Sequence, residues 1–206
     1  MLYFLFKGGP VVIPLIIISI FGLAVIIDRL IVIRRVYRFN MEKFCDAVCR
    51  KIASGKLEDA LNLSRQHKNQ PIGAMFTSAL ENNELTRPSL EKMLERVGNH
   101  EVKKLEKRLG GLVSIVGIAP LLGFLGTITG LIRAFMAWEK AGNDVTVSSL
   151  ASGIYEAMIT SAIGLMIAIP YYLCYNYFIS RIKYFAHELD DYAGQLLEAM
   201  SKAKFL

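Results

Sequence analysis

The chain has 206 residues, of which 53% are hydrophobic and 20% charged, and its mean hydropathy is +0.39. This composition excludes an ordinary soluble domain and indicates an integral membrane protein. The formal net charge is +6, but the basic residues flank apolar stretches and form no aromatic-studded groove, which favours contact with anionic lipid over nucleic-acid binding.

Three charge-free stretches are long enough to cross a bilayer, whose hydrocarbon core of roughly 30 Å needs about 20 helical residues. They cover residues 10–27, 109–132 and 157–180, and a further charge-free run, 145–155, precedes the third. Lys7 before an apolar run could indicate a signal peptide, but no small-residue cleavage site follows the run. The first stretch is therefore predicted to be a retained anchor.

Positive charge predicts the orientation of the spans, because cytoplasmic flanks are richer in Lys and Arg. The loop between the second and third spans has one basic residue, Lys140. The opposite flanks carry Arg29, Arg34, Arg35, Arg38, Lys103, Lys104, Lys107, Arg108, Arg181 and Lys183. Residues 28–108 and the C-terminal tail are therefore expected to be cytoplasmic, with the N-terminus outside.

The fold class predicted is an all-α membrane protein with three transmembrane helices, the second and third of which extend into a cytoplasmic helical bundle. Thr86-Arg-Pro88 has the pattern of a helix start, and no proline follows before Pro120. If the run is continuous, one helix extends from about residue 87 to 138, and Gly98 and the Gly110-Gly111 pair are its weak points. The predicted segments are an outward-facing N-terminus (1–9), the first span (10–27), a cytoplasmic helical region (28–108), the second span (109–138), a short outer loop (139–147), the third span (148–180) and a cytoplasmic C-terminal helix (181–206).

Polar groups inside the second and third spans are the strongest functional signal. Hydrocarbon offers them no partner, so they must face protein or water. Thr127 is six residues from Arg133 and Ser161 is five from Glu156. In antiparallel spans with Arg133 and Glu156 at the outer interface, both hydroxyls lie about 8–9 Å inward. We therefore predict an ion pathway formed by Thr127, Glu156, Thr160 and Ser161, with Arg133 at the outer interface.

Small residues and prolines in the same spans predict close helix contact and kinks. The candidates are Gly123, Gly126, Gly130, Gly164, Pro120 and Pro170. One small or polar stripe of the third span comprises Ser152, Glu156, Thr160, Gly164 and Ala168. Plainer interpretations stay open: Thr127 can bond the Gly123 carbonyl four residues earlier, Arg133 can be an interface anchor, and Glu156 can reach the interface.

Three spans cannot enclose a pore, so a hydroxyl-lined path requires a homo-oligomer whose spans surround a shared axis. A driven step also needs a titrating group, and Glu156 is too shallow to be the central relay. A second chain carrying a membrane carboxylate is therefore expected. Cys45, Cys49 and Cys174 have no His neighbours at metal spacing and are expected to be reduced packing residues. No catalytic residue, cofactor or metal site is predicted.

Long ordered motifs resemble the ExbB/TolQ/MotA family of proton-channel subunits over nearly the whole chain. The first span is preceded by Lys7-Gly-Gly-Pro10 and closed by Asp28-Arg29-Leu30. The motif of the second span is Ala119-Pro-Leu-Leu-Gly-Phe-Leu-Gly-Thr-Ile-Thr-Gly130. In the third span the motifs are Gly153-Ile-Tyr-Glu-Ala157, Ala162-Ile-Gly-Leu165 and Ala168-Ile-Pro170. The family's pore positions match Thr127, Glu156 and Ser161. The last is usually threonine in ExbB and TolQ, and serine keeps the hydroxyl but loses a methyl group.

The resemblance implies a homopentamer around two copies of a single-span partner of the ExbD/TolR type, whose membrane aspartate takes and releases protons. The expected function is that of a subunit of a proton-motive-force-driven motor in the bacterial inner membrane, with a TonB-like or Tol-system protein as a further candidate partner. The alternatives are a non-conducting membrane scaffold and a flagellar-type stator subunit, and the latter is disfavoured because only three spans exist. ExbB type versus TolQ type, and proton versus sodium, stay open.

Overall fold

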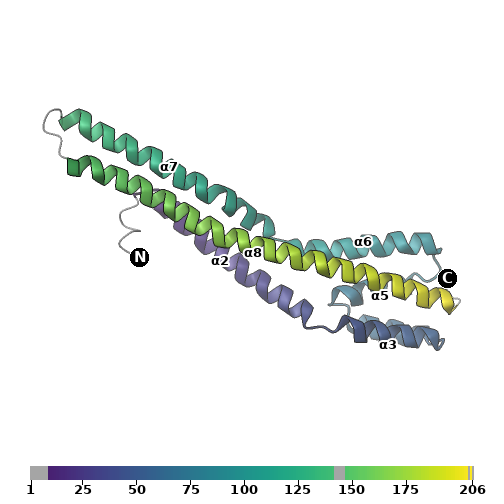
Figure 1. Ribbon diagram of the computed structural model, residues 1–206. Helices are drawn as coiled ribbons and strands as arrows, with labels where there is room; N and C mark the ends of the chain where they lie inside the picture. The colour runs from purple at the N-terminus through teal and green to yellow at the C-terminus, as the bar shows by residue number, and fades with distance from the viewer. Residues whose placement is uncertain (1–8, 142–146, 204, 206) are drawn as a thin grey trace. The chain divides into compact units, whose positions relative to one another are not determined.

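The computed structural model describes residues 9–141, 147–203 and 205, with side chains described for 9–140, 151–203 and 205. Within these ranges every regular element is a helix (Figure 1). Three of the helices, α2, α7 and α8, are long and apolar enough to cross a membrane. The predicted all-α membrane fold is thus confirmed. The helices are α2 (Val12–Tyr37), α3 (Met41–Ala53), α4 (Leu57–Gln66), α5 (Pro71–Glu81), α6 (Arg87–Glu106), α7 (Leu109–Ala141) and α8 (Val147–Lys202).

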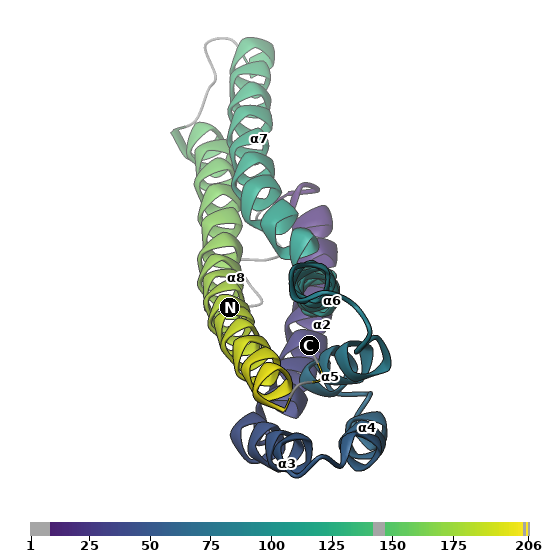
Figure 2. The same ribbon diagram turned by 90° about the vertical axis from the view of Figure 1, so that its right-hand side faces the viewer.

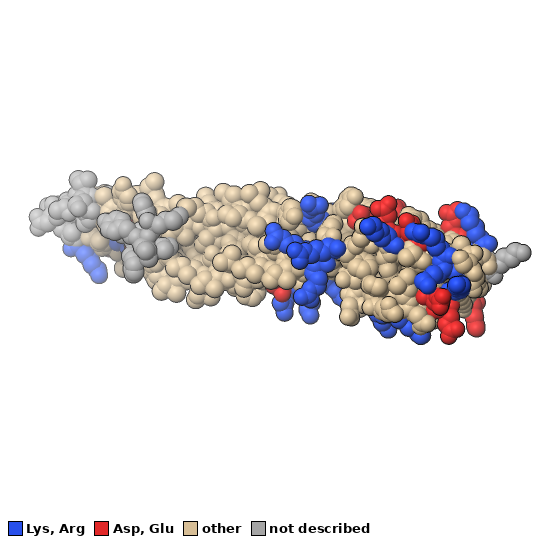
Figure 3. Space-filling view, turned by 90° about the horizontal axis from the view of Figure 1, so that it is seen from below, with Lys and Arg blue, Asp and Glu red and all other residues tan. Residues whose placement is uncertain are grey.

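The chain divides into two compact units, and α2 and α8 each contribute to both. The membrane unit comprises residues 1–28 and 108–177, and the bundle unit comprises residues 29–107 and 178–206. Figure 3 shows a face on which acidic and basic side chains gather over the bundle unit, while the surface of the membrane unit carries few. This separation follows from the sequence, because the charge-free stretches fall in the membrane unit apart from residues 178–180.

In the membrane unit, α7 and α8 run side by side (Figures 1 and 2). Glycines line their contact, because only a residue without a side chain lets the two backbones approach so closely. A Cβ atom on Gly164 would lie 2.6 Å from the Ala119 carbonyl oxygen, and one on Gly130 would lie 3.0 Å from the Ala157 Cβ. The spacing of small residues therefore sets the register between α7 and α8.

Helix α2 packs against this pair through hydrogen bonds between Ser19 and Tyr171 and through a glycine, Gly22. The Tyr171 hydroxyl of α8 donates to the Ser19 carbonyl oxygen at 2.5 Å. Gly22 leaves room for the Tyr171 ring, which a Cβ atom at that position would overlap. Further along, Leu15 is buried with Ala119 and Ala168. The tyrosine satisfies its polar group inside the protein, as a group surrounded by hydrocarbon must.

The bundle unit is built from amphipathic helices around aromatic and aliphatic side chains. Helix α4 packs on α3 and α5, and α5 packs on α6 (Figure 2). Phe44 of α3 contacts Phe76 of α5, with ring centroids 5.6 Å apart. The C-terminal part of α8 repeats apolar residues at helical spacing and buries Phe185 and Leu189 among others. This unit therefore has its own hydrophobic core.

The run from residue 87 to 138 is not one continuous helix: it is interrupted just before the Gly110-Gly111 pair that the sequence marks as a weak point. Helix α6 ends at Glu106 and α7 begins at Leu109. Between them, Arg108 adopts a φ of 71°, a left-handed conformation that a helix cannot contain. In the membrane unit Arg108 pairs with Asp28, Nη1 to Oδ2, at 3.0 Å. In the bundle unit the buried Arg29 donates to the Leu105 carbonyl at 3.2 Å, which satisfies an acceptor at the end of α6.

The predicted start of α6 is confirmed in position but differs in its cap. Thr86 occupies the N-cap position and Pro88 lies in the first turn. The Thr86 hydroxyl lies 3.0 Å from the Ser89 hydroxyl and makes no side-chain bond to the backbone of the first turn. The extended backbone of Thr86 and the following proline therefore define this end.

Candidate ion-pathway site

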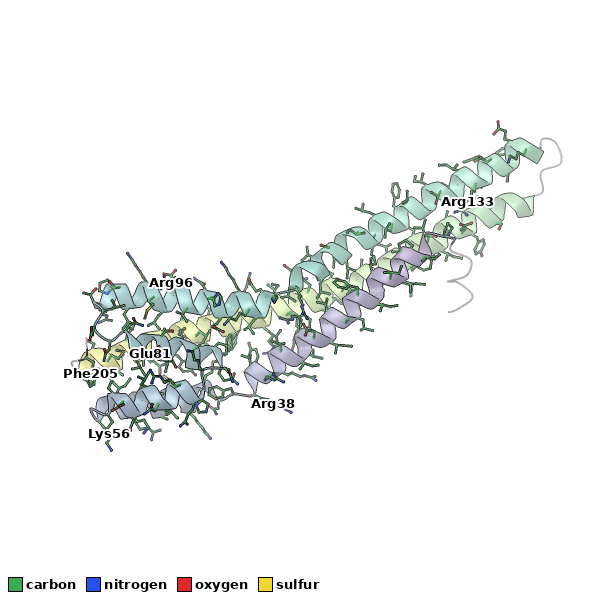
Figure 4. The ribbon with its side chains drawn as sticks, turned by 180° about the vertical axis from the view of Figure 1, so that it is seen from behind. Arg38, Lys56, Glu81, Arg96, Arg133 and Phe205 are labelled. Carbon is green, nitrogen blue, oxygen red and sulfur yellow. The ribbon has the colours of Figure 1, made fainter. Side chains whose placement is uncertain are left out.

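An ion pair joins α7 and α8 at the end of the membrane unit where α8 begins. Figure 4 labels Arg133 on α7, beside the neighbouring turns of α8. Its Nη2 lies 2.8 Å from Oε1 of Glu156, and the two side chains are 47% and 21% exposed. This Oε1 is buried and receives no directional hydrogen bond from the described residues. The Arg133 charge is therefore its close electrostatic partner, and the pair places both residues at one level.

Thr160 is part of the contact between α7 and α8. Its side chain is completely buried, and its hydroxyl donates to the Glu156 carbonyl oxygen at 2.8 Å. A Cβ atom on Gly126 would overlap the Thr160 methyl group. Thr160, which the sequence predicted as a pathway residue, therefore packs against Gly126 within the chain.

Thr127 and Ser161 are both half-buried and lie at similar levels along the helix pair. A Cβ atom on Gly123 would lie 3.2 Å from the Ser161 Cα, and Gly126 faces Thr160. Because the helices are antiparallel, Thr127 and Ser161 are separated along the pair by less than about one turn, roughly 5 Å. The Thr127 hydroxyl donates to the Phe124 carbonyl at 2.6 Å, three residues earlier. The plainer interpretation, in which Thr127 bonds a carbonyl of its own helix, is therefore met with Phe124 as the acceptor in place of Gly123.

The two prolines at which kinks were predicted lie inside continuous helices. Pro120 is within α7 and Pro170 is within α8, and both helices continue through them. Ala119 directly precedes Pro120, and Ala168 lies two residues before Pro170. Both alanines are buried in one small core together with Leu15. The predicted packing glycines Gly123, Gly126, Gly130 and Gly164 all face the partner helix closely.

The sequence reasoning did not identify Gly9 as a neighbour of this site. A Cβ atom on Gly9 would overlap Oε1 of Glu156 and would lie 3.3 Å from Nη2 of Arg133. The signal available in the sequence was the glycine pair directly before Pro10, which predicts a turn but does not say what the turn touches. A contact between residues so distant along the chain is visible only in the folded structure.

The cysteines are free thiols, and two of them form a pair on α3 outside the membrane unit. The sulfur atoms of Cys45 and Cys49 are 3.8 Å apart. Hydrogen bonding to Cys49 and burial raise the pKa of Cys45, and the hydrogen bond from Cys45 lowers the pKa of Cys49. Among the described residues no three His, Cys, Asp or Glu side chains gather as a metal site would require.

The chemistry available in the membrane unit is therefore narrow. A carboxylate compensated by a guanidinium lies at one end, and hydroxyls follow about one turn further in. The sequences 109–132 and 157–180 contain no Asp, Glu, Lys, Arg or His. Hydroxyls can order water and pass hydrogen bonds along, but they do not take up and release a proton near neutral pH. Such an arrangement can order water beside a compensated carboxylate.

Comparison with known proteins identifies the family of the chain. A family model described as the MotA/TolQ/ExbB proton channel family matches residues 67–191, which is more than half of the chain. The chain belongs to this family. The resemblance predicted from the motifs is thereby confirmed, and the matched region includes α7 and most of α8.

Similar proteins carry ExbB and TolQ names. An ExbB homologue named for biopolymer transport in Methanothermobacter thermautotrophicus is 31% identical over 179 residues, which cover 86% of this chain and 63% of that protein. A Synechocystis protein named ExbB-like 1 is 32% identical over 87% of this chain and 72% of its own length. The Tol-Pal system protein TolQ of Haemophilus influenzae is 32% identical over 52% of this chain, and the chain spans 46% of TolQ.

Proposed function

We propose that this membrane protein is a subunit of a proton-motive-force-driven motor of the ExbB/TolQ type, forming an oligomeric ring around a single-span partner. One observation carries the proposal: the Glu156 carboxylate is compensated by Arg133, hydroxyls lie further in, and residues 109–138 and 148–180 contain no other carboxylate. The protein can therefore line a path and supply an outer charge pair, but a second chain must supply the group that takes up the proton.

The proposed path begins at Glu156 and continues past Thr127 and Ser161. Both hydroxyls are half-buried in the single chain, so part of each surface is open to another chain or to water. Thr160 is completely buried against Gly126. Its contribution to the path is therefore to hold the backbone and carbonyl of Glu156, while Thr127 and Ser161 supply the exposed polar groups.

A ring of identical subunits would surround this path, with five copies as the family resemblance implies. The membrane unit leaves large apolar side chains exposed on both helices, and in an oligomer such surfaces meet lipid or neighbouring copies. On α7 and α8 they include Leu121, Phe124, Leu125, Ile128, Met158, Leu165, Met166 and Ile169. An apolar surface on more than one side suits a subunit that contacts both lipid and other subunits.

The proposed partner is an ExbD/TolR-like protein with one membrane span and a membrane aspartate. A TonB-like or Tol-system protein is the further candidate partner. The protein would lie in the bacterial inner membrane, with the N-terminus outside and the bundle unit in the cytoplasm. This orientation agrees with the positive charge of Arg29, Arg34 and Arg35 on α2 and of Arg38 directly after it.

Proton flux into liposomes tests the proposal. Three preparations are compared: the chain alone, the chain with a single-span partner, and the chain with a partner whose membrane carboxylate is changed to an amide. The proposal expects low flux from the chain alone, coupled flux with the partner, and loss of it with the amide. Rapid flux from the chain alone, insensitive to changes at Thr127 and Ser161, would overturn it.

A non-conducting scaffold is the second candidate. It is favoured by the fact that Glu156 is paired within its own chain and that Thr127 bonds a carbonyl of its own helix. A scaffold would retain the partner on purification and give the same low flux in all three liposome preparations. The flux assay combined with co-purification of the partner therefore separates the two functions.

A further inference from the structure

The chain enters α2 through a tight turn at Gly9 and Pro10. Gly9 has a φ of +66°, a left-handed conformation that L side chains rarely adopt. The Val12 amide donates to the Gly9 carbonyl at 3.2 Å, and the Ile13 amide donates to the Pro10 carbonyl at 3.2 Å. These two bonds fix the direction in which the turn meets the rest of the membrane unit.

That turn lies directly on the ion pair between α7 and α8. A Cβ atom on Gly9 would overlap Oε1 of Glu156, would lie 2.9 Å from the Glu156 Cδ and 3.3 Å from Nη2 of Arg133. The overlapped oxygen is the one that pairs with Arg133 and that is buried without a directional hydrogen bond among the described residues. The Gly9 backbone therefore occupies the place where water would otherwise reach this oxygen.

We propose that Gly9 is a positioning residue: the absence of a side chain lets the start of α2 close over the Glu156 carboxylate, hold it against Arg133, and shield Oε1 from water. All three residues belong to the membrane unit. The shielding is a property of the folded chain alone, whereas its consequence for ion flow rests on the proposed function. In that setting, an ion or water could reach Oε1 from this side only after the turn at Gly9 moves.

Two effects of a side chain at position 9 must be separated, namely backbone strain and contact with the carboxylate. Gly55, in the turn between α3 and α4, supplies the matched control. Its φ is +73°, close to that of Gly9, but a Cβ atom there would have no atom within 4 Å. Gly55→Ala therefore introduces similar strain without any contact, while Gly9→Ala introduces both.

Chemical modification of carboxyl groups measures the shielding directly. The purified full chain is treated with a water-soluble carbodiimide and an amine, and modification at each carboxyl is followed by peptide mass spectrometry. Glu139 of α7 is exposed and serves as the internal reference. We expect Glu156 to react several-fold more slowly than Glu139 in the unchanged protein, and Gly9→Ala to raise its rate severalfold because the carboxylate must move off Arg133.

A shorter carboxylate supplies the rescue. Glu156→Asp withdraws the carboxyl group by one methylene and makes room for a Cβ atom at position 9. Gly9→Ala should therefore change the rate at position 156 much less in the Glu156→Asp background than in the unchanged protein. Gly55→Ala should leave the ratio of Glu156 to Glu139 modification unchanged.

Equal modification rates of Glu156 and Glu139 in the unchanged protein overturn the inference, and that measurement needs no variant to fold. An unchanged Glu156 rate in a folded Gly9→Ala protein overturns it as well. If the modification rates behave as expected but proton flux does not depend on Glu156, the shielding by Gly9 is supported and the proposed role of Glu156 in the path fails.

Discussion

Gly126 of α7 and Thr160 of α8 are so close that a Cβ atom on the glycine would overlap the threonine methyl group. The Thr160 hydroxyl points along its own helix and donates to the Glu156 carbonyl at 2.8 Å. A polar residue inside a membrane span can therefore serve helix packing through its methyl group while its hydroxyl is satisfied locally. This pair holds the two helices that carry the proposed path.

Gly126→Ala should destabilise the protein because the added methyl group has no room beside Thr160. Overpacking of this kind costs about 1–3 kcal/mol, so the midpoint of thermal unfolding in detergent should fall. Gly117→Ala on the same helix is the control, because a Cβ atom there would meet no atom within 4 Å. Alanine in that open helical position should be neutral or stabilising by up to about 1 kcal/mol. Equal effects of the two changes would contradict the packing role.

The proposed role of the Thr127 and Ser161 hydroxyls in the path predicts a loss of function without a loss of assembly. Thr127→Val and Ser161→Ala remove the hydroxyls and nearly keep the side-chain volume, so the oligomer should form normally while partner-dependent proton flux falls sharply. Ser114→Ala is the control, because this α7 hydroxyl is exposed and bonds the Gly110 carbonyl of its own helix at 3.1 Å. Size-exclusion chromatography and liposome flux are measured together. Near-normal flux in the Thr127 and Ser161 double variant would exclude the relay.

The Arg133–Glu156 pair predicts an asymmetry between single and double variants. Arg133→Gln leaves a carboxylate with a buried oxygen and no compensating charge, which costs roughly 3–5 kcal/mol for a fully buried pair. The cost should be smaller here, because the Arg133 and Glu156 side chains are 47% and 21% exposed. Arg133→Gln should lower thermal stability more than the double change Arg133→Gln with Glu156→Gln. A double variant that is less stable than Arg133→Gln alone would show that the two residues do not compensate each other.

Glu156→Gln tests function apart from this stability effect. The amide keeps the shape and hydrogen bonding of the side chain but removes its charge, so partner-dependent flux should fall in an intact oligomer. Glu156→Ala should reduce flux further if the side chain also orders water. Unchanged flux in both variants would assign Glu156 to the interface alone.

The local features of this fold were predictable, and the contacts between distant residues were not. Charge-free length located α2, α7 and α8. The assignment of Thr127, Glu156 and Ser161 to a pathway, made from the family motifs, stays a prediction. The Gly110-Gly111 pair marked a weak point of the run, but propensity could not place the break at Arg108 itself, because tertiary contacts stabilise the irregular backbone there. The contact of Gly9 with Glu156 was equally hidden, since it depends on how three separate helices meet.

The left-handed backbone at Arg108, between α6 and α7, predicts that Arg108→Gly does not lower the thermal stability of the protein. The φ of 71° at Arg108 costs an L residue roughly 1–2 kcal/mol, a cost that glycine avoids. The ion pair with Asp28 that would be lost contributes about 0–1 kcal/mol at this exposure. Arg108→Gly should therefore be neutral or stabilising in thermal unfolding, while Arg108→Ala, which keeps the strain and loses the pair, should be destabilising. A greater loss of stability with glycine than with alanine would contradict the strain at this position.

The thiol pair on α3 predicts a pH-dependent reactivity at Cys49. The Cys45 and Cys49 sulfur atoms lie 3.8 Å apart and either thiol can donate, but once Cys49 ionises only the Cys45 thiol can, which stabilises the Cys49 thiolate and lowers its pKa from the ordinary value of 9.0. Iodoacetamide reacts with the thiolate, so the pH of half-maximal alkylation at Cys49 should lie below 9.0 in the unchanged protein. Cys45→Ala removes the donor, and the Cys49 pKa and the alkylation curve should move to higher pH.

Cys45→Ser is the matched control for that experiment, because its hydroxyl can still donate to Cys49 and should keep most of the shift. Alkylation of Cys49 is followed by peptide mass spectrometry across a pH series, with Cys45 monitored in the same samples. Burial and the donated hydrogen bond raise the pKa of Cys45, so Cys45 should stay unmodified over the range in which Cys49 reacts. Identical Cys49 curves in the unchanged protein and in Cys45→Ala would show that the hydrogen bond does not control this thiol, because only the loss of a donor separates the two proteins.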